Sequence, residues 1–388
     1  MMHPRRPVQV AAALVTAAVL AMTGACAGPL SGQAAPAAQA TPVAAVTASP
    51  ALGTTDVSPV QPVTIAVGRG TITTLAVTSP TGAEVKGTLS PDRTTWTLAE
   101  PLGYAKTYSV TGTAMGSDGK AVAIEGNYTT VNPAEKITSK ISPGDNAVVG
   151  VAAPVIIRFG SAPVDRSLIE KHVSITTTPK VEGAWAWITH DGDKWPSLDW
   201  RPKDYWPAGT TVHVSSDLYG LDLGGGTFGG DTVTSDFTIG RNQVVKADAN
   251  AHTMVVQQNG VTVATYDASY GSGDVIGDPN RVTRSGTHIV MDKKETTTMS
   301  NPAYGYTDVT EHWAVRISDN GEFIHQNQDT VAAQGVDNVS HGCINLSAQD
   351  AQAYFQTAIY GDPVEVTGTS VQLSPADGDI YDWAIPWS

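Results

Sequence analysis

Short runs of alternating hydrophobic and polar residues dominate the chain from residue 56 onwards. Val63, Ile65 and Val67 show the period of two that is typical of a half-buried strand, and similar runs recur at 155–159 and 212–214. Gly, Pro and Asp residues separate these runs, as expected of turns between strands. The pattern therefore predicts a mainly β chain.

Two stretches repeat the same spacing, which indicates tandem domains. In each, a tryptophan precedes a threonine by 11 residues and a valine follows at a matching offset: Trp96, Thr107 and Val110, then Trp200, Thr211 and Val214. Short strands in units of this length fit immunoglobulin-like (Ig-like) β-sandwiches, here without a cysteine pair between the sheets. We predict Ig-like domains at 56–133 and 134–240.

The second stretch is rich in aromatic residues, and two interpretations stay open. Such side chains most often fill a core and an interface to the next domain. A cluster on the surface could instead stack on sugar rings. The residues are Trp185, Trp187, Trp195, Trp200, Tyr205 and Trp206.

A third domain begins near residue 241, where the pattern changes. Two hydrophobic runs flank Asn259 and Gly260, a pair that strongly favours a hairpin turn. A helix is predicted over 347–360, because Ser347 can cap it and apolar side chains follow at helical spacing. Further strands are predicted at 287–291, 313–317, 323–325 and 364–366.

The predicted fold is mainly β, with two tandem Ig-like β-sandwiches followed by a third domain. We expect residues 241–368 to form a β-rich domain with one or two short helices. Residues 369–388 form a Trp-rich C-terminal tail, which is too apolar to be left loose and is expected to pack on the preceding domains.

The first 26 residues are typical of an export signal. A basic pair, Arg5 and Arg6, precedes an apolar stretch that is too short for a comfortable membrane span. The stretch ends in Thr-Gly-Ala-Cys, which resembles a bacterial lipoprotein signal whose cysteine, here Cys26, becomes lipidated. Ordinary cleavage near Ala25 or Ala27 is the alternative, whereas a twin-arginine signal fits poorly.

Residues 27–55 contain no charged residue and consist mainly of Ala, Pro, Thr, Ser and Gln. This composition predicts a flexible tether. Together with a lipid anchor, such a tether suits a domain held above a membrane. We therefore expect an exported lipoprotein in the cell envelope, at the outer face of the cytoplasmic membrane.

Charge and cysteine content narrow the classes of function. The formal net charge is −14 and no basic stripe is present, so we expect no nucleic-acid partner. The chain has two cysteines, Cys26 and Cys343, which excludes a disulfide framework. Cys343 has no partner for a disulfide if Cys26 is lipidated, and such a thiol is either buried and inert or a nucleophile.

The surroundings of Cys343 favour a nucleophile. It lies in the motif Ser-His-Gly-Cys-Ile-Asn at 340–345, and the preceding Gly342 allows a ligand to approach the backbone. His341 and His325 are available as bases. Backbone N–H groups around Gly342 and Cys343 could face a developing oxyanion.

His325, 14 further residues and then this motif together resemble the signature of the L,D-transpeptidases, which have a YkuD-type catalytic domain. The resemblance extends over about residues 55–388, because multidomain members also carry tandem Ig-like domains, a lipoprotein-like leader and a Trp-rich tail. It implies a Cys343 nucleophile with His325 as general base. It also implies that the backbone carbonyl of Gln326 orients His325.

The resemblance assigns further roles around the pocket. His341 and Gly342 shape the pocket and the oxyanion site, together with the Cys343 amide. Tyr306 resembles the hydroxyl donor on a facing lid, and Asn345 holds the turn of the motif. Tyr304, Ser340, Tyr306 and Asn345 are the expected substrate-binding residues. Asp329 stands where some relatives have Trp, which affects contacts with acceptor or inhibitor.

The implied activity is that of a cysteine acyltransferase acting on peptidoglycan stem peptides without metal or cofactor. It releases D-Ala from a donor tetrapeptide and forms a 3→3 cross-link through a Cys thioester. Carbapenems are the implied covalent inhibitors. With another acceptor, the same site gives an L,D-carboxypeptidase or a wall-anchoring transferase.

Other interpretations are weaker but remain open. His325, His341 and Cys343 could ligate Zn²⁺, although the sequence offers no evident fourth ligand. His341 could be a structural imidazole, and Tyr306 could serve packing alone. The N-terminal half by itself would suggest a non-enzymatic Ig-like lipoprotein that binds the cell wall.

Overall fold

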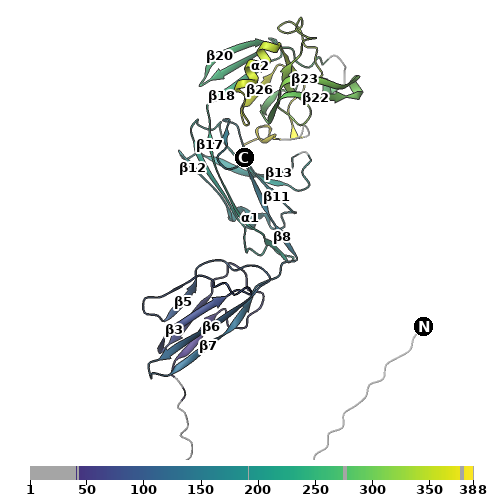
Figure 1. Ribbon diagram of the computed structural model, residues 1–388. Coiled ribbons are helices and arrows are strands. Elements are labelled where there is room, and N and C mark those ends of the chain that lie inside the picture. The colour runs from purple at the N-terminus through teal and green to yellow at the C-terminus, as the bar shows by residue number, and fades with distance from the viewer. Residues whose placement is uncertain (1–40, 42, 191, 274–277, 376–379, 388) are drawn as a thin grey trace, which may run out of the picture. The chain divides into compact units, whose positions relative to one another are not determined.

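The computed structural model describes residues 41, 43–190, 192–273, 278–375 and 380–387 (Figure 1). The predicted export signal, Cys26 and most of the predicted tether lie outside the described residues. The structure is mainly β, as predicted, with two α-helices in the part that it describes. No helix among these residues is long and apolar enough to cross a membrane.

The first domain is a β-sandwich of a four-stranded sheet, in the order β1-β2-β5-β4, and a three-stranded sheet, in the order β3-β6-β7. Ile65, Val110 and Tyr128 come from both sheets and are fully buried between them. The strands are β1 (Ala45–Ser49), β2 (Thr64–Gly68), β3 (Gly70–Thr78), β4 (Gly87–Leu89), β5 (Thr95–Leu98), β6 (Thr107–Gly116) and β7 (Ala121–Thr129).

The predicted tether at 27–55 extends too far. Its C-terminal part contains β1, which pairs antiparallel with β2 from Ala45 opposite Gly68 to Ser49 opposite Thr64. Backbone hydrogen bonds to β2 stabilise this edge strand, whose small, uncharged side chains resemble those of a linker. Composition alone therefore does not distinguish it from a tether.

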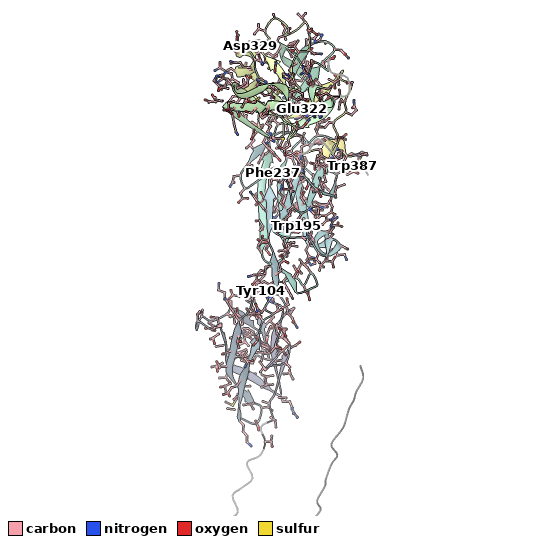
Figure 2. The ribbon with its side chains drawn as sticks, turned by 90° about the vertical axis from the view of Figure 1, so that its right-hand side faces the viewer. Tyr104, Trp195, Phe237, Glu322, Asp329 and Trp387 are labelled. Atoms are coloured by element: carbon pink, nitrogen blue, oxygen red, sulfur yellow. The ribbon has the colours of Figure 1, made fainter. Side chains whose placement is uncertain are left out.

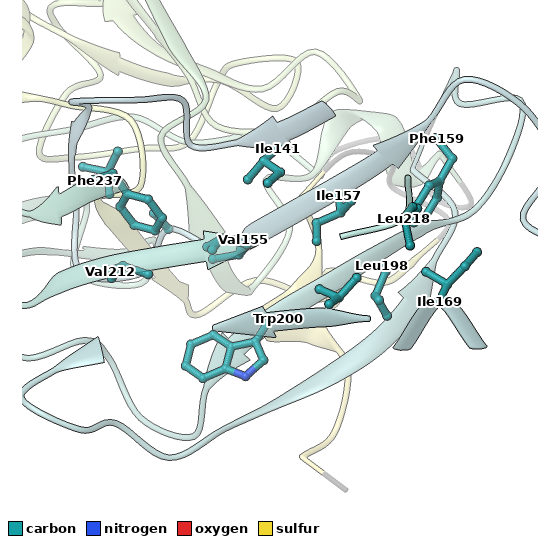
Figure 3. Close-up of a cluster of buried hydrophobic side chains, with 14 of the residues drawn as sticks. Ile141, Val155, Ile157, Phe159, Ile169, Leu198, Trp200, Val212, Leu218 and Phe237 are labelled. Atoms are coloured by element: carbon teal, nitrogen blue, oxygen red, sulfur yellow. The ribbon is translucent and has the colours of Figure 1, made fainter. Parts of the chain in front are cut away.

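The second domain has two four-stranded sheets, β10-β17-β15-β12 and β13-β14-β11-β9, and a small β16-β8 sheet. Figure 3 shows how side chains such as Val155, Trp200 and Phe237 pack together in its core. Its elements are β8 (Glu135–Ile137), β9 (Ser139–Ser142), β10 (Val148–Val149), β11 (Val155–Phe159), α1 (Arg166–Lys171), β12 (Val173–Thr178), β13 (Gly183–Ile188), β14 (Ser197–Pro202), β15 (Thr211–Asp217), β16 (Thr227–Gly229) and β17 (Thr232–Ile239).

The two repeated tryptophans occupy equivalent places. Trp96 on β5 covers Gly87 of β4, and Trp200 on β14 covers Gly183 of β13. In both hairpins a Cβ on the glycine would lie 1.9 Å from the indole ring. The sequence repeat thus reflects the same cross-strand packing in both sandwiches.

Tyr104 joins the two sandwiches. Its hydroxyl donates to the carbonyl of Gly229 at 2.7 Å and accepts from the amide of Gly220 at 3.0 Å, at the junction shown in Figure 2. Its ring also packs edge-on against Tyr219. The contacts of Tyr104 at this junction are therefore both polar and aromatic.

Three of these aromatic residues, Trp200, Trp206 and Tyr205, lie in the core of the second domain or at its interface with the third. Trp200 and Trp206 are buried with ring centroids 4.9 Å apart. Tyr205 donates to Glu365 of the third domain at 2.9 Å and packs against Trp383 of the tail. These contacts fit the first of the two interpretations better than a sugar-stacking surface.

The third domain has a five-stranded sheet, β20-β19-β18-β26-β21, and a four-stranded sheet, β22-β23-β24-β25. The elements are β18 (Gln243–Asp248), β19 (Thr253–Gln258), β20 (Val261–Asp267), η1 (Pro279–Arg281), β21 (Gly286–Ile289), β22 (Asp292–Asn301), η2 (Pro302–Tyr304), β23 (Tyr306–Arg316), β24 (Phe323–Gln326), β25 (Ile344–Leu346), α2 (Ala348–Thr357) and β26 (Pro363–Thr367).

A hairpin turn and a helix predicted for this domain are both present, and the helix is shorter than predicted. Asn259 and Gly260 form the turn between β19 and β20 with φ of 50° and 77°, as the hairpin prediction requires. Ser347 caps α2 by accepting from the amide of Asp350. The helix ends at Thr357 rather than at residue 360, because Ala358 is already extended.

The tail returns to the second domain. The indole N–H of Trp383, in η4 (Asp382–Ala384), donates to the carbonyl of Ala152 at 2.8 Å. Arg201 donates to the carbonyls of Asp382 and Ile385, each at 2.9 Å. The tail therefore packs on the second domain.

Candidate active site

A cavity of about 280 Å³ in the third domain contains both Cys343 and His325. The β22–β23 hairpin, β24 and the 340–345 motif contribute its walls. It is lined by Met299, Tyr306, Val309, Glu311, His325, Asn327, Asp329, Thr330, Val339, Ser340, His341, Cys343 and Asn345. Most of the residues singled out in the sequence thus meet in one cavity.

His325 lies at the centre of the polar contacts. It sits on β24, pairs in parallel with Asn345 of β25 and is 3% exposed. Its Nδ1 donates to the backbone carbonyl of Gln326 at 2.6 Å, which leaves Nε2 for Cys343. The identity of the Gln326 side chain does not enter this contact, because the carbonyl alone accepts.

Glu311 is a partner of His325 that the sequence pattern does not predict. Its Oε2 lies 3.2 Å from His325 Nδ1. Burial lowers the pKa of His325, but hydrogen bonding to Cys343 and Glu311 and the charges of both raise it more, to about 10. The imidazolium form is therefore favoured at neutral pH, next to a cysteine.

The Ser340 hydroxyl organises the turn that carries the nucleophile. It donates to the carbonyl of Cys343 at 2.6 Å and accepts from the amide of Gly342 at 3.1 Å. This corrects the expectation that the Gly342 N–H faces an oxyanion, since that group already donates within the turn. Gly342 has φ of +121°, which favours glycine there.

Thr283 fixes the same turn from outside and was not predicted. Its fully buried hydroxyl donates to the carbonyl of Gly342 at 2.8 Å and accepts from the amide of Gly271 at 2.9 Å. A lone threonine in the sequence gives no signal for such a contact. The thiol of Cys343 is half-buried, and its Sγ lies 3.6 Å from the carbonyl of Gly321.

Tyr304 and Tyr306 pack on the ring of His341. The ring of Tyr304 lies 5.3 Å from that of His341 at an interplanar angle of 22°, and Tyr306 lies 5.5 Å from it at 39°. Tyr304 also donates to Asp278 at 2.7 Å. Burial, and then the charges of Cys343, Tyr304 and Glu311, raise the pKa of Tyr306, so its hydroxyl remains a donor.

Asn345 connects the motif to the loop that precedes it. It is buried, and its side-chain amide donates to Thr330 at 3.2 Å while its backbone exchanges two hydrogen bonds with Ser269. Asp329 lies on the wall of the cavity, where it adds a carboxylate.

Within the described parts of the chain, one cluster has three or more potential metal-binding side chains, and it lies outside this cavity. It consists of His190, Asp199 and Asp382. His190 Nε2 lies 2.7 Å from Asp199 Oδ2, and its Nδ1 accepts from the amide of Ile380 at 3.2 Å. The cluster therefore joins the tail to the second domain.

Comparison with known proteins places these features in context. Residues 242–366 match the family described as the L,D-transpeptidase catalytic domain, and residues 54–222 match the bacterial Ig domain.

Two curated relatives from Mycobacterium tuberculosis match most of the chain. L,D-transpeptidase 5 is 47% identical over 346 residues, which cover 89% of this chain and 76% of that protein. L,D-transpeptidase 2 is 38% identical over 346 residues, covering 88% and 83%. A solved L,D-transpeptidase in complex with imipenem is 34% identical, covers 61% of this chain and has a TM-score of 0.49.

Proposed function

The chain belongs to the L,D-transpeptidase family, and from this premise we propose that it forms 3→3 cross-links in peptidoglycan through a thioester on Cys343. One observation carries the proposal. Cys343 and His325 share a cavity, and His325 is oriented from its far side by the carbonyl of Gln326. A nucleophile, a base and an orienting group in this order are the requirements of acyl transfer by a thiol.

In the first half-reaction, the Cys343 thiolate attacks the carbonyl of the third residue of a donor tetrapeptide, at the L-centre of its diamino acid. A C–S bond forms and the carbonyl oxygen becomes an oxyanion, which the Cys343 amide stabilises. His325 then gives its Nε2 proton to the leaving nitrogen. The C–N bond breaks, D-Ala leaves, and a thioester remains.

In the second half-reaction, a side-chain amine of a neighbouring stem attacks the thioester. His325, now neutral, accepts a proton from this amine, and the thiolate leaves to restore the starting ion pair. The product is a 3→3 cross-link. Tyr306 and His341 line the cavity with Cys343, Tyr304 packs on His341, and these three side chains position the stem peptides.

Carbapenems are proposed as covalent inhibitors of the same site. Their strained ring carbonyl accepts the thiolate, and ring opening replaces the departure of an amine. Water is a poor acceptor at a site that uses an amine, so the adduct persists. Intact-mass measurement should show one added drug per chain, and none on Cys343→Ala, which still contains Cys26.

We also propose that the protein is exported and anchored by lipid at Cys26, on the outer face of the cytoplasmic membrane. The support is the lipoprotein-like end of the leader. Labelling of cells with a fatty-acid analogue, comparing wild type with Cys26→Ala, tests the anchor. If the wild type is not labelled, the anchor is refuted and ordinary cleavage near Ala25 or Ala27 is the remaining interpretation of the leader.

Incubation with purified muropeptides tests the activity. Cross-linked dimers and free D-Ala from the wild type, with neither from Cys343→Ala, are the expected result. Tripeptides without dimers would identify an L,D-carboxypeptidase, and transfer to another wall component would identify an anchoring enzyme. Equal release of D-Ala by both chains would refute the proposed enzymatic activity. The wall-binding lipoprotein would then be the remaining interpretation.

A further inference from the structure

We propose that Glu311 is a positioning residue that stabilises the imidazolium form of His325, so that Cys343, His325 and Glu311 act as a triad. This inference rests on the proposed function of Cys343 and His325. It adds a charged side chain to an arrangement in which a backbone carbonyl alone orients the ring.

The contacts around Nδ1 support this assignment. Glu311 Oε2 lies 3.2 Å from Nδ1, while the carbonyl of Gln326 lies 2.6 Å from the same atom. The side chains are 15% exposed for Glu311 and 4% exposed for His325. The pair is thus shielded from solvent, where a charge acts more strongly than at the surface.

The backbone of β23 is distorted in a way that directs Glu311 toward His325. Val315 belongs to the buried cluster that contains Phe355 of α2, and Trp313 packs on the same Phe355, so both face the helix. Regular alternation would place Glu311 on that same face, away from His325.

The alternation is broken at Trp313, which has a left-handed φ of +53°. Bulky residues rarely adopt this conformation, and the ladder to β22 skips from Ala314 to His312. Beyond the break, Glu311 faces His325. Residues held in such rarely adopted backbone conformations are often found at functional sites.

A carboxylate does what a carbonyl cannot. Both accept a hydrogen bond from Nδ1 and so orient the ring, but the negative charge of Glu311 also favours the protonated ring. A protonated ring keeps a proton on Nε2 for the leaving nitrogen. Because of this charge, the imidazolium form of His325 persists to a higher pH.

Among the titratable groups of the described residues near the motif and the cavity, Glu311 is the carboxylate that contacts Nδ1 of His325. Beyond the motif, Glu322 accepts a hydrogen bond from the amide of Arg284 at 2.9 Å and pairs with its guanidinium at 3.7 Å. Within the described residues, the titratable groups that line the cavity with His325 are Tyr306, Glu311, Asp329, His341 and Cys343.

The test is a pH titration of the His325 ring in the full chain by ¹⁵N NMR, assigned with a His325→Gln variant. In the wild type the ring should lose its proton near the pKa of about 10. In Glu311→Gln, which keeps the shape of the side chain but removes its charge, the midpoint should fall by about one to three pH units. Glu311→Asp should restore part of the shift.

Glu295→Gln is the matched control. Glu295 lies exposed on the neighbouring strand β22, and the substitution removes the same charge. It should leave the His325 titration in place, and thermal unfolding should be alike in all variants. An unchanged midpoint in Glu311→Gln, or an equal fall in Glu295→Gln, would overturn the proposal.

A second measurement separates this inference from the proposed function. The alkylation rate of Cys343 by iodoacetamide, followed by mass spectrometry of its peptide, needs no stem substrate. Glu311→Gln should lower the rate at neutral pH, because fewer chains hold the thiolate–imidazolium pair. An unchanged alkylation rate in Glu311→Gln would refute the triad, even if the wild type forms cross-links. If the wild type forms no cross-links but the His325 titration shifts in Glu311→Gln, only the proposed reaction is refuted.

Discussion

Thr283 holds the turn of the nucleophile, and its replacement separates the contribution of its hydroxyl from that of its methyl group. In Thr283→Val, the methyl group that replaces the hydroxyl has nearly the same shape. The carbonyl of Gly342 and the amide of Gly271 then lose their partner in a fully buried place. In Thr283→Ser, the hydroxyl stays and one methyl group is lost.

The expected costs differ in size and in cause. A buried backbone group without a partner costs about 1–3 kcal/mol, so two such groups destabilise the valine variant by about 2–6 kcal/mol. Loss of one buried methyl group costs the serine variant about 1 kcal/mol. Valine should therefore be the more damaging substitution, although it is the more hydrophobic one.

Hydrogen exchange of the strands around the third-domain core measures this difference locally, because the chain has several domains and need not unfold in one step. Acylation of Cys343 by a carbapenem should also slow more in the valine variant, since no hydroxyl then holds the Gly342 carbonyl and fixes the turn. If valine is as well tolerated as serine in both measurements, the hydroxyl does not hold the motif and the reasoning fails.

Three further substitutions test other parts of the structure. His325→Ala should slow acylation of Cys343 by about 10²–10⁴-fold with the fold retained, as measured by intact mass over time; unchanged rates would make His341 the base. Gly361→Ala should destabilise the third domain by about 1–2 kcal/mol or more in urea, because φ is +88° and the new Cβ would lie 2.5 Å from the side chain of Ala153. Burial and the charge of Asp199 raise the pKa of Asp382, so the stability that its protonated form adds at low pH is lost as pH rises through the raised pKa. Asp382→Asn, whose side chain stays uncharged, should remove this pH dependence of tail docking, and equal pH dependence of tryptophan fluorescence in both chains would contradict this.

The sequence predicts most reliably those features that depend on neighbouring residues. The hairpin at Asn259 and Gly260 follows from the positive φ that both positions need, and α2 follows from its cap at Ser347. The meeting of His325 and Cys343 follows from a motif in which both residues are fixed by spacing.

Features that depend on distant backbone geometry could not be predicted. Glu311 reaches His325 because Trp313 interrupts the alternation of β23, and an alternating pattern gives no sign of such an interruption. Thr283 and Gly342 meet across 59 residues of chain. The hydrogen bond from the Gly342 amide to the Ser340 hydroxyl could not be predicted either, because a serine has several rotamers and only the folded turn selects one.

The attachment of the tail to the second domain has a consequence for the order of synthesis. Ile380 contacts His190 across 190 positions, so this partner site leaves the ribosome long before the residues that cover it. Domains generally fold as they emerge, and the second domain must therefore form with His190 and Asp199 still open to water. Its last hydrogen bonds close when the final residues are released. A chain that stops before residue 380 would thus retain Cys343 and His325 in the third domain. Its defect would lie in the second domain, where the hydrogen bond from Ile380 to His190 would be missing.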